Sequence, residues 1–232
     1  MAKALGHGCI ALILTALSFF GGLAWVLALF WRGKGRLFAF LAIYFALSLP
    51  HTIFLNTSLG WEQRPDNWRV LAVFETTPWI KSPWIYRTLN RTYVSPEMHE
   101  VVNDLAAHMH EKFKYDTQAL EGTQTVVLDG SFPFFNGFPL LPHLSHDDGE
   151  KLDLALYWTD AEGRYLKGKS KSPIGYWGYV EGPSDCPKTW KDLRWNMPWL
   201  QTVLPDRQLD ETRTRAALEW LAQDARVSKV LV

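Results

Sequence analysis

Two long uncharged runs of hydrophobic residues occupy the start of the chain. The first covers residues 9–31 and the second covers residues 37–55, where only Pro50 and His51 interrupt it near its end. As a helix rising 1.5 Å per residue, the first run would extend about 35 Å, enough to cross a hydrocarbon core of about 30 Å. A cleaved signal peptide is the alternative, but its apolar stretch is only about 7–15 residues long. The pattern therefore predicts a two-helix transmembrane hairpin within residues 1–55.

The charges around these runs predict an orientation. The short segment 32–36 between the runs carries three cations, whereas Lys3 precedes the first run and Arg64 and Arg69 follow the second. Basic loops of membrane proteins stay on the cytoplasmic side. We therefore expect the membrane bilayer as a partner, with the domain after Asn56 in the periplasm or outside the cell.

The remaining sequence first shows no clear hydrophobic periodicity and then has the pattern of a helix. Residues 56–95 mix Trp, Pro and charged residues, which predicts an irregular connector. Ser95-Pro96-Glu97 has the order of N-cap, proline and acid with which helices begin, and the helix is expected to continue to about Tyr115. Apolar residues recur every four positions on one face of this predicted helix, as packing on a core requires. They are Val101, Leu105, Met109 and Phe113.

Three segments have the pattern of β-strands. Residues 125–129 are β-branched and apolar, residues 151–158 alternate, and residues 226–232 are again apolar. Asp210 is expected to cap a last helix that ends near residue 225. The sequence therefore predicts an α+β chain, in which residues 96–232 form a small antiparallel-sheet domain with flanking helices.

Charge and cysteine content narrow the classes of function. Four of the 24 basic residues lie in residues 1–55, which leaves 20 basic against 24 acidic residues from Asn56 onward, a net charge of about −4. This balance argues against nucleic acid as a partner. Cys9 lies in the first apolar run and Cys186 stands alone in the outer domain, so the sequence predicts no disulfide framework within the chain.

The candidate chemistry lies in the segment from Pro142 to Trp158. His143 and His146 precede a turn at Gly149, and Asp153 follows within an apolar alternation. A zinc ion binds imidazole nitrogen and carboxylate oxygen, and a catalytic site leaves one position open. An unpaired carboxylate within an apolar strand is costly to bury, so Asp153 needs a metal or another cationic partner. A surface loop with a salt-bridged Asp153 is the alternative.

The spacing His146-x-x-Gly149-x-x-x-Asp153 resembles the zinc motif of a superfamily of metallopeptidases. This superfamily includes lysostaphin-type endopeptidases, D-Ala-D-Ala carboxypeptidases and the hedgehog signalling domain. His143, three residues earlier, is most similar to the penicillin-insensitive murein endopeptidase branch. The resemblance implies that His146 and Asp153 are zinc ligands and that His143 is a nearby catalytic-site residue.

One departure from this family concerns its third ligand. The family takes a third zinc ligand and a catalytic histidine from an H-x-H element near the C-terminus, but no His follows His146 in this chain. Three explanations remain open: the chain is C-terminally truncated, with Cys186 separated from a partner; His108 or His110 completes the site; or the domain binds without cutting. Residues two apart on a helix point about 200° from each other, which argues against both His108 and His110 contributing.

The resemblance implies a hydrolase of the bacterial cell wall. We expect a protein anchored in the bacterial cytoplasmic membrane that acts as a zinc metallopeptidase on peptidoglycan peptide cross-links, with little or no hydrolysis by these 232 residues alone. The alternative function is a non-catalytic, membrane-anchored binding or scaffold protein with a degenerate peptidase fold.

Overall fold

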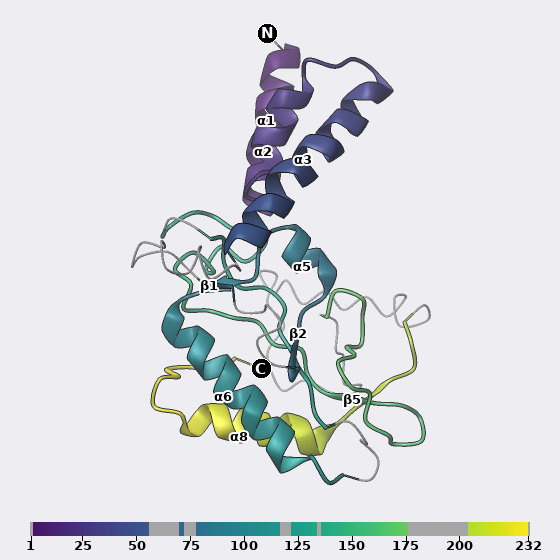
Figure 1. Cartoon of the computed structure of the whole chain (residues 1–232), viewed down its shortest axis with the longest axis vertical. Helices are drawn as coiled ribbons and strands as arrows, with labels where there is room; N and C mark the ends of the chain where they lie inside the picture. Colours follow the sequence, from purple (N-terminus) through teal and green to yellow (C-terminus); the bar gives the residue numbers. More distant parts are fainter. Residues whose placement is uncertain are drawn as a thin grey trace, which may run out of the picture. The chain divides into compact units, whose positions relative to one another are not determined.

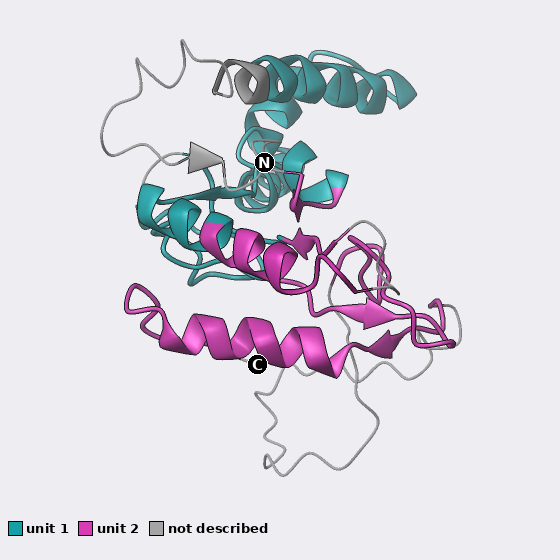
Figure 2. Ribbon diagram, turned by 60° about the horizontal axis from the view of Figure 1, so that its bottom comes forward, with its two compact units in different colours: residues 1–77, 84–103, 127–153 teal, residues 78–83, 104–126, 154–232 magenta. Residues whose placement is uncertain are grey.

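In the described part of the chain, helices predominate over strands, which are few and short (Figure 1). The computed structural model describes residues 2–55, 70–71, 78–116, 122–133, 136–175 and 204–231. They divide into two compact units whose segments alternate along the sequence (Figure 2). Unit 1 comprises residues 1–77, 84–103 and 127–153, and unit 2 comprises residues 78–83, 104–126 and 154–232.

The N-terminal hydrophobic runs form three helices of unit 1 instead of two. The first run is divided between α1 (Ala2–Leu17) and α2 (Gly21–Ala28), and the second run lies in α3 (Lys34–Leu55). The division occurs because α2 packs closely on α1. A Cβ on Gly21 would lie 2.5 Å from the Leu14 carbonyl oxygen. The length of an uncharged run does not show whether the chain reverses direction within it.

The predicted transmembrane hairpin is therefore wrong. Within the part of the chain that the structure describes, no helix is both long enough and apolar enough to cross a bilayer. α1 has 16 residues and α2 has 8, whereas the predicted first span had 23.

Short segments of unit 1 pair around β3 (Tyr93–Val94). β3 pairs antiparallel with β1 (Val70–Leu71), so that Val70 lies opposite Val94. Backbone hydrogen bonds also join Tyr93 and Ser131 in both directions. The preceding helix α5 covers Trp84–Thr88. The predicted connector 56–95 thus contains ordered elements in its described part, whereas residues 56–69 and 72–77 lie outside the described residues, as does Cys186.

Unit 2 is built from two short sheets and a helical core. β2 (Ile80–Lys81) pairs in parallel with β4 (Thr125–Val126), and β5 (Trp158–Thr159) pairs antiparallel with β6 (Gln208–Leu209). The last helix, α8, covers Glu211–Gln223. A cluster of buried residues forms the core of this unit. It comprises Leu105, Met109, Tyr157, Tyr165, Ala216 and Ala217.

Both predicted helices after residue 95 are confirmed. α6 covers Pro96–Lys112, and the Ser95 hydroxyl accepts a hydrogen bond from the Met98 backbone N–H at 3.2 Å, as a helix N-cap does. α8 follows Asp210, whose carboxylate accepts a hydrogen bond from the Arg213 backbone N–H at 2.9 Å. Both N-caps could be predicted because helix capping depends on the local sequence.

The predicted antiparallel-sheet domain is wrong. The described residues form three separate two-stranded sheets, one of which is parallel. Of the predicted strand 151–158, only Trp158 belongs to a named strand, and the described residues 226–231 form none. The alternation in 151–158 arises because this segment runs beside residues 126–130, with which it shares scattered backbone hydrogen bonds instead of a continuous ladder.

Candidate metal centre

Two extended segments of unit 1 bring a pair of aspartates together. The backbone N–H of Leu128 donates to the Asp153 carbonyl, and the Asp153 N–H donates to the Asp129 carbonyl, both at 2.8 Å. On the other side of this segment, the Gly130 N–H donates to the Arg91 carbonyl at 2.7 Å. A Cβ on Gly130 would lie 2.8 Å from the Tyr93 carbonyl oxygen, so only glycine permits this approach. The hydrogen bonds fix Asp129 and Asp153 in neighbouring segments.

A tight turn places the two imidazoles beside these carboxylates. The His146 N–H donates to the His143 carbonyl at 3.0 Å, and the two ring centroids are 5.1 Å apart. Gly149 then adopts φ of +82°, a left-handed conformation that favours glycine, and its carbonyl accepts from the Ser95 N–H at 2.8 Å. The chain reverses there and returns through Asp153, as the sequence predicted.

His146 is buried and oriented by the backbone. Its side chain is 9% exposed, and its Nδ1 lies 2.9 Å from the Gly130 carbonyl oxygen. A carbonyl can only accept, so Nδ1 is the donor in this hydrogen bond and Nε2 is the ring nitrogen left to bind a metal. Histidine ligands of metals are commonly held in this way through their second nitrogen. Nε2 of His146 lies 3.5 Å from Asp153 Oδ1.

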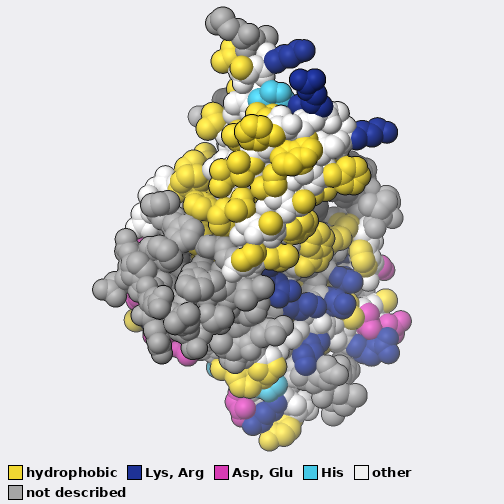
Figure 3. All heavy atoms as spheres, turned by 45° about the horizontal axis from the view of Figure 1, so that its top comes forward, with side chains coloured by type: hydrophobic (Ala, Val, Ile, Leu, Met, Phe, Trp, Pro, Cys, Tyr) yellow, Lys and Arg dark blue, Asp and Glu magenta, His cyan; other side chains and the backbone are white. Residues whose placement is uncertain are grey.

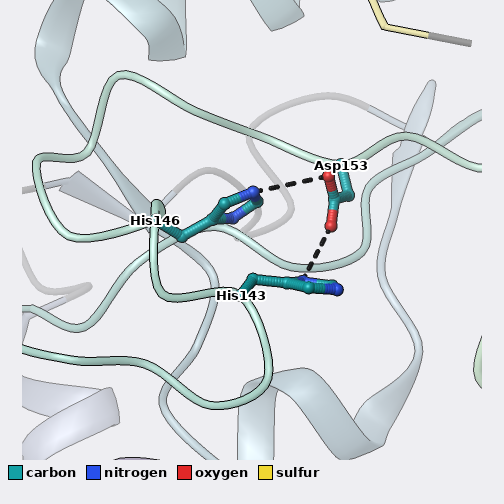
Figure 4. A group of neighbouring side chains, drawn as sticks. All are labelled: His143, His146 and Asp153. Carbon is teal, nitrogen blue, oxygen red and sulfur yellow. Dashed lines mark ion pairs between the residues drawn. The ribbon is translucent and has the colours of Figure 1, made fainter. Parts of the chain in front are cut away.

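The two imidazoles lie beside the Asp153 carboxylate, each facing a different one of its oxygens (Figure 4). Nδ1 of His143 lies 3.1 Å from Asp153 Oδ2, and one ligand atom from each of His143, His146 and Asp153 lies within 4.8 Å of the others. Ligand atoms about 2.0–2.1 Å from a tetrahedral metal are about 3.3 Å apart. Each imidazole lies near this distance from one oxygen of Asp153, which is Oδ2 for His143 and Oδ1 for His146. The structure thus contains a possible metal-binding triad.

Asp129 and Arg91 support the triad, although neither was predicted from the sequence to have a role. Asp129 Oδ2 lies 2.9 Å from His143 Nδ1. Arg91 binds the same carboxylate through both oxygens, with Nε donating to Oδ1 at 2.7 Å and Nη2 donating to Oδ2 at 2.5 Å. The exposed fractions are 4% for Arg91 and 1% for Asp129. The only sequence signal was an Asp-Gly pair at the end of an apolar segment, and nothing in the local sequence indicates Arg91.

The backbone completes the environment of the Arg91 guanidinium. Its Nη1 donates to the Leu141 carbonyl at 2.5 Å and to the Leu17 carbonyl at 3.1 Å. Leu17 is the last residue of α1, and Leu141 precedes the histidine turn. Arg91 therefore connects three parts of unit 1 that are distant in sequence.

The two carboxylates change the protonation of His143. Hydrogen bonds to Asp129 and then to Asp153 raise the pKa of His143 to about 9, against the opposing effect of partial burial. Arg91 already balances the charge of Asp129, so without a metal the imidazolium of His143 is the cationic partner that Asp153 requires. A divalent cation would take over that role and displace the proton.

The two upstream histidines have packing partners within unit 2. His110 stacks on Trp79 with ring centroids 4.6 Å apart, and the ring of His108 lies 6.1 Å from that of Trp220. Within the described residues, the group that can hold a metal consists of His143, His146 and Asp153. The third possible ligand in this group is therefore His143, and not His108 or His110.

Comparisons with protein-family models, with curated proteins and with solved structures found no match to this chain. The resemblance to zinc metallopeptidases therefore remains a prediction from the motif.

Proposed function

We propose that this chain is a zinc-binding, metallopeptidase-like protein that recognises the peptide cross-links of peptidoglycan, with little or no hydrolysis by these 232 residues. The observation that carries the proposal is the convergence of one ligand atom each from His143, His146 and Asp153 within 4.8 Å. Two imidazole nitrogens and one carboxylate oxygen are a ligand set that suits zinc. The motif spacing adds the resemblance to peptidases of the cell wall.

The donors fit zinc in geometry and in charge. Gly130 holds His146 in the tautomer whose Nε2 can bind a metal, as described above. One carboxylate and two neutral imidazoles would leave the bound dication with a net charge of about +1, and three protein ligands leave one tetrahedral position for a substrate. A zinc ion bound there would act as a Lewis acid toward a peptide carbonyl and water.

The chain's own residues would orient the site more than they would transfer protons. The resembled peptidases take their catalytic histidine from an element that has no counterpart after His146. Asp129 contacts the triad, but it is 1% exposed and accepts two hydrogen bonds from Arg91, so it is held as a structural acceptor. We therefore expect stoichiometric zinc with little or no peptide hydrolysis.

Non-catalytic binding of peptidoglycan peptides is the second candidate function. The state of Asp129 favours it, because the carboxylate beside the triad is 1% exposed and paired with Arg91 and so is poorly placed to act as a base. The two functions differ in their need for metal. A peptidase requires zinc, whereas a binding or scaffold domain would bind muropeptides with or without it.

Metal content of the full chain tests the proposal. After chelation, addition of zinc and gel filtration, elemental analysis should find one zinc per chain in the natural sequence. His146→Ala and Asp153→Ala should each lose at least tenfold in zinc affinity, because each removes a ligand. His99→Ala is the matched control, since His99 lies on α6 outside the triad and its ring nitrogen Nδ1 lies 3.3 Å from the Asn103 side-chain nitrogen.

The outcomes separate the alternatives. Equal zinc content in all four proteins would refute the metal site. Zinc-dependent cleavage of purified muropeptides, lost in His146→Ala, would refute the expected inactivity while supporting the peptidase assignment. Muropeptide binding that does not change when zinc is removed would favour the binding function.

A further inference from the structure

The N-terminal helices expose large apolar side chains at their surface. Fifteen of the nineteen large hydrophobic residues that are exposed in the described chain lie between residues 5 and 49 (Figure 3). The most exposed are Phe30 at 85%, Leu12 at 73% and Phe38 at 72%. We call the exposed apolar side chains of residues 5–49 the N-terminal apolar surface. It is far larger than the scattered apolar residues normal for a surface facing water.

The contacts between these helices involve small and polar residues. Gly21, Gly22, Ala24 and Ala28 are the buried residues of α2. Ser18 is 5% exposed, and its hydroxyl lies 2.5 Å from the Tyr44 hydroxyl. A helix of a water-soluble bundle directs its large apolar residues inward. In residues 5–49, by contrast, fifteen large apolar residues are exposed, and the buried positions of α2 are glycine and alanine.

The charges of the N-terminal segment indicate which class of partner suits this surface. Residues 1–55 contain no Asp or Glu, and their four cations are Lys3, Arg32, Lys34 and Arg36. The N-terminus and the turn between α2 and α3 lie at the same end of the helices (Figure 1), and basic side chains gather there beside the apolar surface (Figure 3). Helices that expose apolar side chains and carry cations but no acidic residue complement a bilayer with anionic headgroups.

We propose that the N-terminal apolar surface binds an anionic lipid bilayer, with the basic residues 32–36 at the headgroups. Such binding requires only that the apolar side chains enter the outer hydrocarbon layer, as those of interfacial helices do. It needs no helix that crosses. A second copy of the chain would satisfy the apolar side chains, but it would place the basic ends of two copies near each other or leave them without a counter-charge.

Flotation of the full chain with vesicles tests this surface. Vesicles of phosphatidylcholine mixed with phosphatidylglycerol should carry the protein upward in a density gradient, and vesicles of phosphatidylcholine alone should carry at least fivefold less. Raising the salt concentration from about 0.1 M to about 1 M shortens the Debye length from about 10 Å to about 3 Å, so it should weaken binding to the anionic vesicles.

Two variants separate the apolar and basic contributions. Leu12→Glu/Phe38→Glu places charges on α1 and α3 and should lower binding to both kinds of vesicle at least tenfold. Arg32→Gln/Lys34→Gln/Arg36→Gln should remove the preference for phosphatidylglycerol. Tyr115→Glu/Leu231→Glu is the matched control, because these side chains are 85% and 81% exposed and lie in unit 2, and it should float like the natural chain.

Two results would overturn the proposal. One is a natural chain that stays at the bottom of the gradient with every vesicle at both salt concentrations, a result that depends on no variant. The other is a chain that sediments as a dimer without binding lipid and becomes a monomer in Leu12→Glu/Phe38→Glu, which would assign the surface to a second copy.

Discussion

Replacement of Asp129 by alanine should strongly destabilise unit 1. The substitution removes a carboxylate that is 1% exposed and leaves Arg91, itself 4% exposed, without its counter-charge. Breaking a buried ion pair by removing one partner costs about 3–5 kcal/mol, because an uncompensated charge stays buried. At about 2–4 °C per kcal/mol for a domain of this size, the midpoint of thermal unfolding should fall by roughly 10 °C.

A double-mutant cycle shows whether the loss belongs to the pair. Arg91→Ala should cost at least as much as Asp129→Ala, because it also removes the donor to the Leu17 and Leu141 carbonyls. Arg91→Ala/Asp129→Ala should cost little more than Arg91→Ala alone, which corresponds to a coupling free energy of at least about 2 kcal/mol. The four proteins would be compared by urea unfolding followed by circular dichroism.

A solvent-exposed ion pair provides the control for this measurement. Arg164 donates to the Asp160 carboxylate at 2.8 Å, but its side chain is 64% exposed. Arg164→Ala should leave the unfolding midpoint unchanged. If Asp129→Ala costs less than about 1 kcal/mol, or if the effects of Arg91→Ala and Asp129→Ala simply add, the inferred buried pair does not stabilise the site.

Two further predictions concern the loop that carries the imidazoles. Gly149→Ala places a Cβ at φ of +82°, so it should destabilise the metal-free protein by about 1–2 kcal/mol and weaken zinc binding. Gly35→Ala is the control and should do neither, because Gly35 lies in a helix with open space around it. Equal melting curves for the two variants would contradict this prediction. The pKa of His143 is about 9 in the folded protein and about 6.5 in the unfolded chain. The stability that its protonated ring contributes is therefore fully present below about pH 6.5 and is lost as the pH rises through 9. The metal-free protein should therefore lose on the order of 2 kcal/mol of stability between these limits, a value reduced because the ring is 31% exposed, and a His143→Ala variant with the same pH profile would exclude this origin.

Local sequence determined the parts of the fold that were predicted correctly. The two helices after residue 95 begin at side chains that cap them, Ser95 and Asp210. α6 buries three of the four predicted apolar positions, Val101, Leu105 and Met109. The turn at Gly149 was also readable, because few residues other than glycine adopt its backbone conformation. Each of these features depends on residues within about one turn of the chain.

The parts that were predicted wrongly depend on long-range packing. The first hydrophobic run had the length of a membrane span, but Gly21 and Gly22 allow the chain to fold back on α1, and hydropathy does not report such a contact. Residues 151–158 alternate like a strand, yet their partner segment contributes Asp129 and Gly130 instead of a regular strand. Periodicity identifies which residues face a core and leaves open which segment covers them.

Only the part of the candidate site that lies within a short stretch of sequence was predicted. The motif placed His146 and Asp153 together, and it indicated His143 as a neighbour with a different role. The structure adds His143 as a third possible ligand through the turn in which the His146 N–H donates to the His143 carbonyl. Arg91 lies 38 residues before Asp129 in the sequence, so no local pattern could connect them.

X-ray absorption at the zinc edge tests the central claim most directly. In the chain loaded with one equivalent of zinc, the spectrum should show two imidazole nitrogens and at least one oxygen at about 2.0–2.2 Å, and His146→Ala should lose one imidazole. A zinc shell made of oxygen alone, or one that keeps both imidazoles in His146→Ala, would show that His143, His146 and Asp153 do not share a metal ion.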